Sequence, residues 1–249
     1  MRDDRDTAAS PEAFLAAAGR PAPAVRATAV APAEEQLPHE FVVLHQRSRI
    51  LQALAEEVVE KGYRQVTVAD IVRRAGVARN TFYESFANKE QCFLAVSDLA
   101  GEEAMHRVAD AVRGASHEWP EQVRAGIRAF LGFVAGESAL ARVFVVESLS
   151  AGPAAAERYE RTVRAVAPFF RLGRRDCEAG DQLPPTLEET IVGGIFWVVY
   201  QRIVVGRPEE LEGLLDELVE FALTPYLGPD AARRFVTAAP AMADPSGLI

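Results

Sequence analysis

The sequence predicts an all-α fold, with a small N-terminal helical domain followed by a larger helical domain. From Phe41 onward, apolar residues recur at the three- and four-residue spacing of amphipathic helices. Glycine and proline mark the breaks between these periodic segments, as they commonly do between helices. No segment shows the two-residue alternation that is typical of a half-buried strand.

The composition is that of an ordinary globular protein and favours neither a membrane nor a secreted class. Hydrophobic residues make up 49% of the chain and charged residues 25%. The longest apolar candidate, residues 191–205, is interrupted by glycines and polar residues and falls short of the roughly eighteen residues of a membrane span. The first residues are too acidic for a signal peptide. We therefore expect a cytoplasmic protein without a membrane partner.

The net charge of −9 at first argues against a DNA-binding protein, because DNA is a polyanion. The charge is unevenly distributed, however. Residues 61–90 hold six basic and three acidic residues, a local charge of +3, and the rest of the chain holds 21 basic and 33 acidic residues, or −12. An acidic body with one basic segment is compatible with a protein that docks on DNA through that segment alone.

Residues 1–40 are expected to form a mostly disordered arm. They are rich in alanine, and several prolines prevent a long helix. Arg20 and Arg26 leave a contact with DNA open, although a solvated tail is the simpler interpretation.

The first domain, residues 41–87, is expected to contain three short helices. Apolar residues at helical spacing predict the first helix, which Gly62 ends. Thr67 is a suitable N-cap for the second helix, with Asp70 three residues later as in a capping box, and Gly76 ends it. Two short helices joined in this way have the dimensions of a helix-turn-helix, whose sharp turn favours glycine.

The third helix, from about Ala78 to Glu84, is expected to present polar side chains to DNA. Phe82 and Phe86 lie four residues apart and face inward together. Arginine can pair with guanine edges and asparagine with adenine edges, whereas hydroxyl groups reach phosphates. The opposite side of this helix carries four candidate DNA-binding residues, Arg79, Asn80, Thr81 and Tyr83.

Residues 45–96 resemble the N-terminal domain of the TetR family of transcriptional regulators. The resemblance rests on residues 71–90, IVRRAGVARNTFYESFANKE, with their glycine turn, Thr-Phe-Tyr, a later phenylalanine and Asn-Lys-Glu. Lys89 suits an anion contact because it lies in the first turn of a helix, where backbone amides favour anions. The resemblance implies phosphate contacts by Thr67, Thr81, Tyr83 and Lys89, and base contacts by Arg79 and Asn80.

Three positions depart from the pattern of that family. Ala78 stands where the family often has Ser or Thr, so a cap or phosphate-binding hydroxyl is missing. Ser85 stands where His or Tyr is common, which removes a possible contact. Asn80 replaces what is commonly a small residue, and we expect it to give this protein its own sequence preference.

The second domain, residues 88–228, is expected to bind an effector and to form a dimer. A helix from Asn88 to about Arg113 should join it to the first domain, with Gln91 supporting the cap. Residues 229–249 contain three prolines and are expected to be a frayed tail. Further helices are expected over residues 118–135, 138–149, 154–172, 187–205 and 208–226.

The resemblance to the TetR family implies that the second domain holds a pocket for a small-molecule effector. Apolar and aromatic side chains line such pockets, but aromatic residues at helical spacing are also common in ordinary cores. Glu147 follows an apolar run and is a candidate polar anchor for the effector. The candidate pocket residues are Phe130, Phe133, Phe144, Glu147, Phe170 and Trp197.

The helices expected over 187–205 and 208–226 are the candidate homodimer interface. Residues 190–200 are too apolar to face water, and Gly193 and Gly194 would let another helix approach closely. An intrachain core is the alternative. We favour a dimer with a four-helix interface, because two recognition helices read half-sites about one DNA turn apart and one alone reads too few bases.

Two other functions remain open from the sequence. Glu103 and His106 have the Glu-x-x-His spacing of all-α di-iron enzymes, but such sites need a second copy and two more glutamates. An effector-independent DNA-binding protein would share the helix-turn-helix, although such proteins usually have a broadly basic surface.

The two cysteines, Cys92 and Cys177, lie far apart in the sequence and form no CxxC motif, so they indicate no metal site. We expect a ligand-responsive regulator, most simply a repressor of a palindromic operator, without catalytic residues, metal or cofactor.

Overall fold

The computed structural model describes residues 39–136, 138–146, 153–177 and 180–238, and all regular elements in these ranges are helical. The expected arm falls almost wholly outside the described residues, except that the first helix begins at His39. The α-helices are α2 (His39–Lys61), α3 (Val68–Ala75), α4 (Arg79–Ser85), α5 (Lys89–Gly114), α6 (Trp119–Gly136), α7 (Ser138–Ala141), α8 (Pro153–Arg171), α9 (Leu187–Val205), α10 (Leu215–Leu227) and α11 (Pro229–Ala238).

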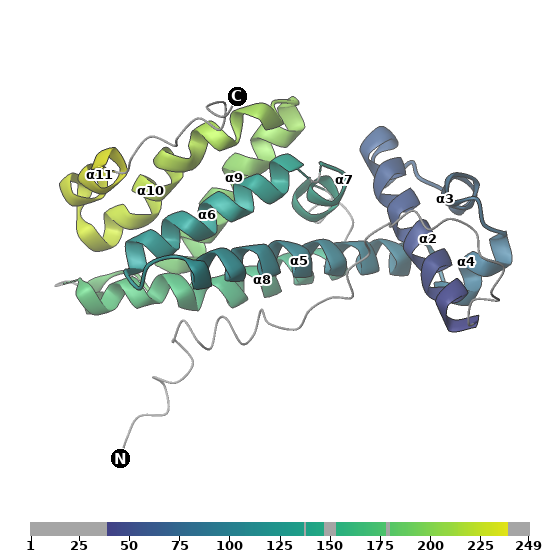
Figure 1. Cartoon of the computed structure of the whole chain (residues 1–249), viewed down its shortest axis with the longest axis horizontal. Helices are drawn as coiled ribbons and strands as arrows, with labels where there is room; N and C mark the ends of the chain where they lie inside the picture. The colour runs from purple at the N-terminus through teal and green to yellow at the C-terminus, as the bar shows by residue number, and fades with distance from the viewer. Residues whose placement is uncertain (1–38, 137, 147–152, 178–179, 239–249) are drawn as a thin grey trace, which may run out of the picture.

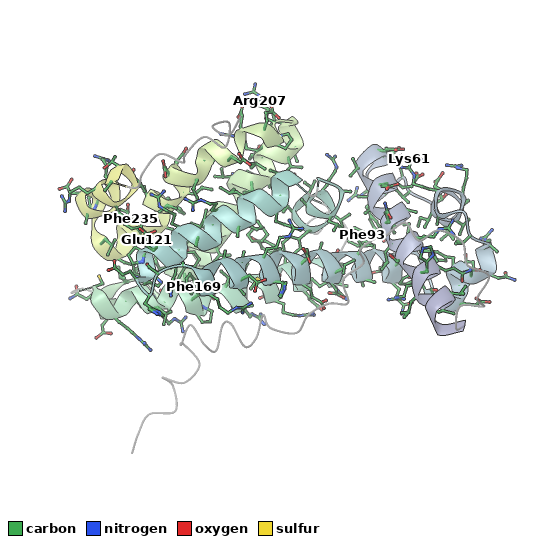
Figure 2. All side chains as sticks on the ribbon, viewed as in Figure 1. Lys61, Phe93, Glu121, Phe169, Arg207 and Phe235 are labelled. Atoms are coloured by element: carbon green, nitrogen blue, oxygen red, sulfur yellow. The ribbon has the colours of Figure 1, made fainter. Side chains whose placement is uncertain are left out.

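Figure 1 shows an elongated molecule in which α2, α3 and α4 form one end and α6 to α11 form the larger body. The long helix α5 runs through both parts. Two hydrophobic cores follow this division. The smaller core is not confined to residues 41–87, because the first turns of α5 supply Phe93 and Val96 to it and Val143 joins from the body. Phe93 lies where α5 enters the small domain (Figure 2).

Local signals explain why the small domain folds as three separate helices. The Thr67 hydroxyl accepts the Asp70 backbone N–H at 3.2 Å, and the Asp70 carboxylate accepts the Thr67 backbone N–H at 3.1 Å, which completes the predicted capping box. Gly76 ends α3 in the left-handed conformation at φ 61°. Asn88 caps α5 by accepting the Gln91 backbone N–H at 2.8 Å.

Two helices of the larger body differ from the sequence prediction. The segment expected as one helix over 138–149 starts as the short helix α7 and continues as a π-helical turn, Arg142–Val146. The segment expected as one helix over 208–226 begins with two 3₁₀ turns, and α10 starts only at Leu215. Gly213 lies inside the second 3₁₀ turn and has low helix propensity, which contributes to the late start.

The expected frayed tail is wrong for residues 229–238, which form α11. Pro229 follows Gly228 and occupies the first turn of the helix, where a missing N–H costs nothing. Ala232 and Val236 lie four residues apart and are buried, so α11 packs on the body. The buried Arg124 of α6 donates to the Val236 carbonyl at 3.4 Å. Residues 239–249 lie outside the described residues.

Within the described ranges, no single helix is long and apolar enough to cross a membrane, although α6 and residues 139–146 pass that test jointly as a bent pair.

Candidate nucleic-acid interface and effector cavity

The short helix α4 rests on two buried phenylalanines. Phe82 and Phe86 are almost completely buried, with ring centroids 5.8 Å apart. Arg47 of α2 lies over the Phe86 ring at 4.3 Å and donates to the Ser85 carbonyl at 3.2 Å. This carbonyl belongs to the last turn of α4 and has no partner within the helix, so Arg47 satisfies it. The inward orientation predicted for the phenylalanines is confirmed.

The opposite side of α4 faces solvent. Arg79, Asn80 and Tyr83 are exposed, and Thr81 is half-buried. The Arg79 guanidinium donates to the Tyr83 hydroxyl at 3.3 Å and lies 5.6 Å from the centre of its ring. One short helix thus presents an arginine, an asparagine and two hydroxyl groups. Side chains of these types can form hydrogen bonds with base edges and phosphates in a major groove.

The turn between α3 and α4 is fixed by Gly76 and Arg49. Arg49 of α2 donates to the Gly76 carbonyl at 3.3 Å. A Cβ atom on Gly76 would lie only 2.6 Å from the same guanidinium group. The position therefore favours glycine for its positive φ, whereas the Arg49 guanidinium is the end of a flexible side chain that could move aside.

Thr67, the candidate phosphate contact before α3, is exposed, and its hydroxyl is already used in the capping box. It donates to Asp70 Oδ2 at 2.6 Å. The pKa of Asp70 is held well below its usual range because its carboxylate accepts hydrogen bonds from the Thr67 hydroxyl group and from the Lys61 and Arg73 side chains. A negative charge is therefore maintained in the first turn of α3, where it favours the helix.

Lys89 differs from the other candidate residues because its ammonium group points back into the small domain. Nζ donates to the Tyr63 carbonyl at 2.9 Å and to the Val66 carbonyl at 2.8 Å. It also lies 4.4 Å from the centre of the Tyr63 ring. Burial lowers the pKa of Lys89. The sequence predicted a position in the first turn of α5, which is confirmed, but gave no sign of these carbonyl partners.

The larger body contains an apolar cavity of about 70 Å³ between α5, α6, α8 and α9. Its walls are entirely hydrophobic, and the sulfur-containing chain of Met105 offers an adaptable side. The lining residues are Ala104, Met105, Val108, Val123, Gly126, Ile127, Phe130, Phe144, Val166, Phe169, Phe170, Val192, Ile195 and Phe196.

Three of the six candidate pocket residues, Phe130, Phe144 and Phe170, line this cavity. Phe133 is buried but does not line it. The assignment of Trp197 is wrong, because this side chain is 56% exposed and stacks on Tyr200 outside the cavity. Glu147 lies outside the described residues. All of these aromatic residues occur at helical spacing in the sequence. Only the packing of the helices determines which of them line the cavity, which lie in the core and which are exposed.

The residues of the Glu-x-x-His pair have other partners. Glu103 accepts from Arg107 at 2.7 Å, and His106 Nε2 lies 3.2 Å from Asp110. Among the described residues, no three histidine, cysteine or acidic side chains are grouped so that they could hold a metal ion.

The outer face of α9 and α10 exposes large apolar side chains. Besides Trp197, the exposed residues include Val204, Val205 and Phe221. Part of the segment 208–226, which was predicted for the dimer interface, packs inside the chain, since Leu211, Leu214 and Leu218 belong to the larger core. Gly194 likewise permits a contact within the chain, because a Cβ atom there would lie 3.1 Å from the Phe221 ring.

The sequence of the small domain matches a known family model. Residues 50–96 match the model for bacterial regulatory proteins of the tetR family. These residues include the helix-turn-helix and the start of α5. The chain carries a DNA-binding domain of the TetR family.

Curated relatives match this chain over part of their length. YvdT of Bacillus subtilis, an HTH-type transcriptional regulator, is 35% identical over 69 residues, 28% of this chain and 34% of the relative. The regulator EthR of Mycolicibacterium smegmatis is 27% identical over 143 residues, 55% of this chain and 65% of the relative. The activator FasR of the same organism is 29% identical over 92 residues, 37% and 42% of the two chains. The chain thus spans between about a third and two thirds of these relatives.

Solved structures extend the likeness to the whole TetR-family fold. The fatty acid degradation regulator FadR of Bacillus halodurans has a TM-score of 0.63 at 20% identity, covering 72% of this chain and 94% of its own. FadR of Bacillus subtilis, solved in complex with stearoyl-CoA, has a TM-score of 0.60 at 20% identity and covers 71% and 97%. At this identity the likeness shows the fold alone.

Proposed function

We propose that this TetR-family chain is a ligand-responsive repressor that binds a palindromic operator as a homodimer. The observation that carries the proposal is the two-sided construction of α4. Phe82 and Phe86 anchor one side, and Arg79, Asn80 and Tyr83 are exposed on the other. A short helix held rigidly in this way can enter the major groove with its polar side chains already placed.

In this proposal the exposed residues of α4 divide into two roles. Arg79 and Asn80 contact base edges, because their planar groups make paired hydrogen bonds with guanine and adenine. Thr81 and Tyr83, together with Thr67 at the start of α3, contact phosphates through their hydroxyl groups. Residues 61–90 carry a local charge of +3 and the rest of the chain −12, which favours the small domain as the part that approaches DNA. Lys61 and Arg74 are paired with carboxylates of α2, whereas Arg79 is exposed on α4.

The homodimer is proposed to form through the exposed face of α9 and α10. Trp197, Val204, Val205 and Phe221 leave large apolar side chains in water in a single chain. A second copy would cover them, and the resulting two-fold symmetry would match a palindromic operator.

The effector is proposed to be an apolar molecule with a long, narrow chain that enters the cavity in the larger body. A cavity of about 70 Å³ is smaller than most ligand sites, so binding has to move the phenylalanine and methionine side chains of its wall. The wall is hydrophobic throughout, which suits an acyl chain and offers no partner to a polar ligand. The complex of the structural neighbour FadR with stearoyl-CoA supports this class.

The switch follows from the position of α5. Ala104, Met105 and Val108 of α5 line the cavity, and the first turns of the same helix belong to the small core. An effector that displaces α5 changes the separation of the two recognition helices in the dimer. A coupling free energy of roughly 1–3 kcal/mol is enough for a useful change in operator affinity.

The proposal can be tested by selecting duplexes from a random pool with the purified protein. We expect an enriched sequence with two inverted half-sites about one DNA turn apart, bound by two chains. Stearoyl-CoA should then raise the unfolding temperature and release the duplex, whereas coenzyme A without an acyl chain should do neither. Failure to enrich any sequence would contradict a regulator. Enrichment without any effect of acyl compounds would instead favour a different effector or none.

A further inference from the structure

The ammonium group of Lys89 makes contacts within the small domain, with two backbone carbonyls and one aromatic ring. A lysine has three N–H donors, and two of them bind the Tyr63 and Val66 carbonyls at 2.9 and 2.8 Å. The Tyr63 ring, with its centre 4.4 Å away, covers a further side of the charge. To reach a phosphate, Nζ would have to give up at least part of this coordination, which is costly for a half-buried charge.

The two carbonyls lie at either end of the turn that leads into α3. Gly62 begins this turn at φ 75°, and Gln65 closes it with a backbone hydrogen bond to the Gly62 carbonyl at 3.2 Å. Thr67, the N-cap of α3, follows Val66 directly. Lys89 therefore fixes the turn immediately before the helix-turn-helix.

This turn packs against α5. Two residues of α5 that lie one helical turn apart hold the turn in place. Lys89 contacts the Tyr63 ring through its ammonium group, and Phe93 contacts the same ring with centroids 4.3 Å apart. Phe93 is completely buried at the point where α5 enters the small domain (Figure 2). The Tyr63 ring is thus held against α5 by a cation and an aromatic side chain.

We propose that Lys89 is a positioning residue, which fastens the turn before α3 to the start of α5, and that it is not a phosphate ligand. This inference rests on the proposed DNA-binding function and replaces the phosphate contact that the family resemblance implied for Lys89. Through Lys89, a displacement of α5 is passed to the start of the helix-turn-helix as well as to the small core.

The salt dependence of DNA binding separates the two roles of Lys89. Removing a cation that binds a phosphate makes the slope of log K against log salt shallower by about 0.9, whereas removing a positioning residue weakens binding without changing the slope. The experiment measures binding to a duplex selected by the wild-type protein, from about 50 to 200 mM potassium chloride. Lys89→Met keeps the length of the side chain without donors, and Lys89→Gln keeps donors without charge. Arg79→Gln is the comparison variant at a base-reading position: it should change the preferred sequence, whereas Lys89→Met should not.

We expect Lys89→Met to lower the affinity by about ten-fold or more at every salt concentration, with the wild-type slope. Lys89→Gln should retain more affinity than Lys89→Met, because its amide can still donate to a carbonyl. A reduced slope in both variants would overturn the proposal in favour of a phosphate contact. Unchanged affinity in Lys89→Met would overturn it as well.

A second measurement tests the fastening without DNA. Amide hydrogen exchange in the free protein should become faster over residues 62–67 in Lys89→Met, with little change over α10. Unchanged exchange over residues 62–67 would contradict the positioning role. Because this experiment needs no operator, it remains decisive even if the proposed regulatory function fails.

Discussion

Val143 and Phe144 are neighbours in the chain, but their side chains are buried in different hydrophobic cores. Val143 packs with α2 and α5 in the small core, and Phe144 lines the cavity of the larger body. The Phe144 ring faces Phe196 with centroids 5.6 Å apart and closely approaches Gly101 of α5. The π-helical turn Arg142–Val146 therefore connects the cavity wall directly to the small domain.

Alanine substitutions at Val143 and Phe144 should have different effects, because the two side chains belong to different cores. Phe144→Ala is expected to lower the free energy of unfolding by about 3–5 kcal/mol and Val143→Ala by about 2 kcal/mol, because each leaves a cavity. Only Phe144→Ala enlarges the effector cavity, so only this variant should change the affinity for an acyl probe. Urea unfolding and probe titration check both effects. Equal changes in probe affinity would contradict the division.

Acid should weaken the small domain through Asp70. The hydrogen bond from Thr67, followed by those from Lys61 and Arg73, lowers the pKa of Asp70 in the folded state. A carboxylate with a lowered folded pKa stabilises the fold above its unfolded pKa of about 3.9, and this stabilisation is lost as the pH falls through the folded pKa. Wild-type protein should therefore lose stability more steeply than Asp70→Asn below about pH 5. Parallel pH profiles of thermal unfolding for the two proteins would contradict this role.

The buried Glu188 of α9 should make Arg174 indispensable for stability. Arg174 donates to both carboxylate oxygens of Glu188, at 2.6 and 3.1 Å. Arg174→Met leaves that carboxylate buried without its main partner, at an expected cost of about 3–5 kcal/mol. Arg164→Met is the matched control, because the exposed pair of Arg164 with Glu160 contributes at most about 1 kcal/mol. Similar unfolding free energies for the two variants would show that this ion pair is not important.

Charges placed on the outer face of α9 and α10 should prevent dimerisation. Trp197 is 56% and Phe221 45% exposed in the single chain, so Trp197→Glu and Phe221→Lys should fold normally. Burying these charges against a second copy is unfavourable, and sedimentation should therefore give monomers. Arg161→Glu on the exposed side of α8 is the control and should leave the wild-type mass unchanged. Dimers in all three variants would place the interface elsewhere.

The sequence predicts the small domain well because its signals are local. A capping box at Thr67, a left-handed glycine at Gly76 and a cap at Asn88 all act within a few residues. The spacing of Phe82 and Phe86 likewise determines which side of α4 is exposed. Such features can be read without knowing the tertiary structure.

The larger body is less predictable because its pattern does not say what covers each apolar face. Trp197 and Phe144 both lie in apolar segments, yet one faces solvent and the other lines the cavity. The prolines after Gly228 led to the prediction of a frayed tail in place of α11. The burial of α11 depends on contacts with α10 and with Arg124, which the sequence pattern does not reveal. The carbonyl partners of Lys89 also come from residues 23 and 26 positions away, and spacing along one helix cannot reveal them.

The most direct test of the account is a parallel selection of duplexes with the wild-type protein, Arg79→Ala and Asn80→Ala. If the exposed side of α4 reads the operator, each variant should lose preference at its own base position in both half-sites, at a cost of about 1–3 kcal/mol per position. Glu84→Ala, on the same helix, should keep the wild-type preference. Identical enriched sequences for all four proteins would contradict the central claim that α4 is the recognition helix.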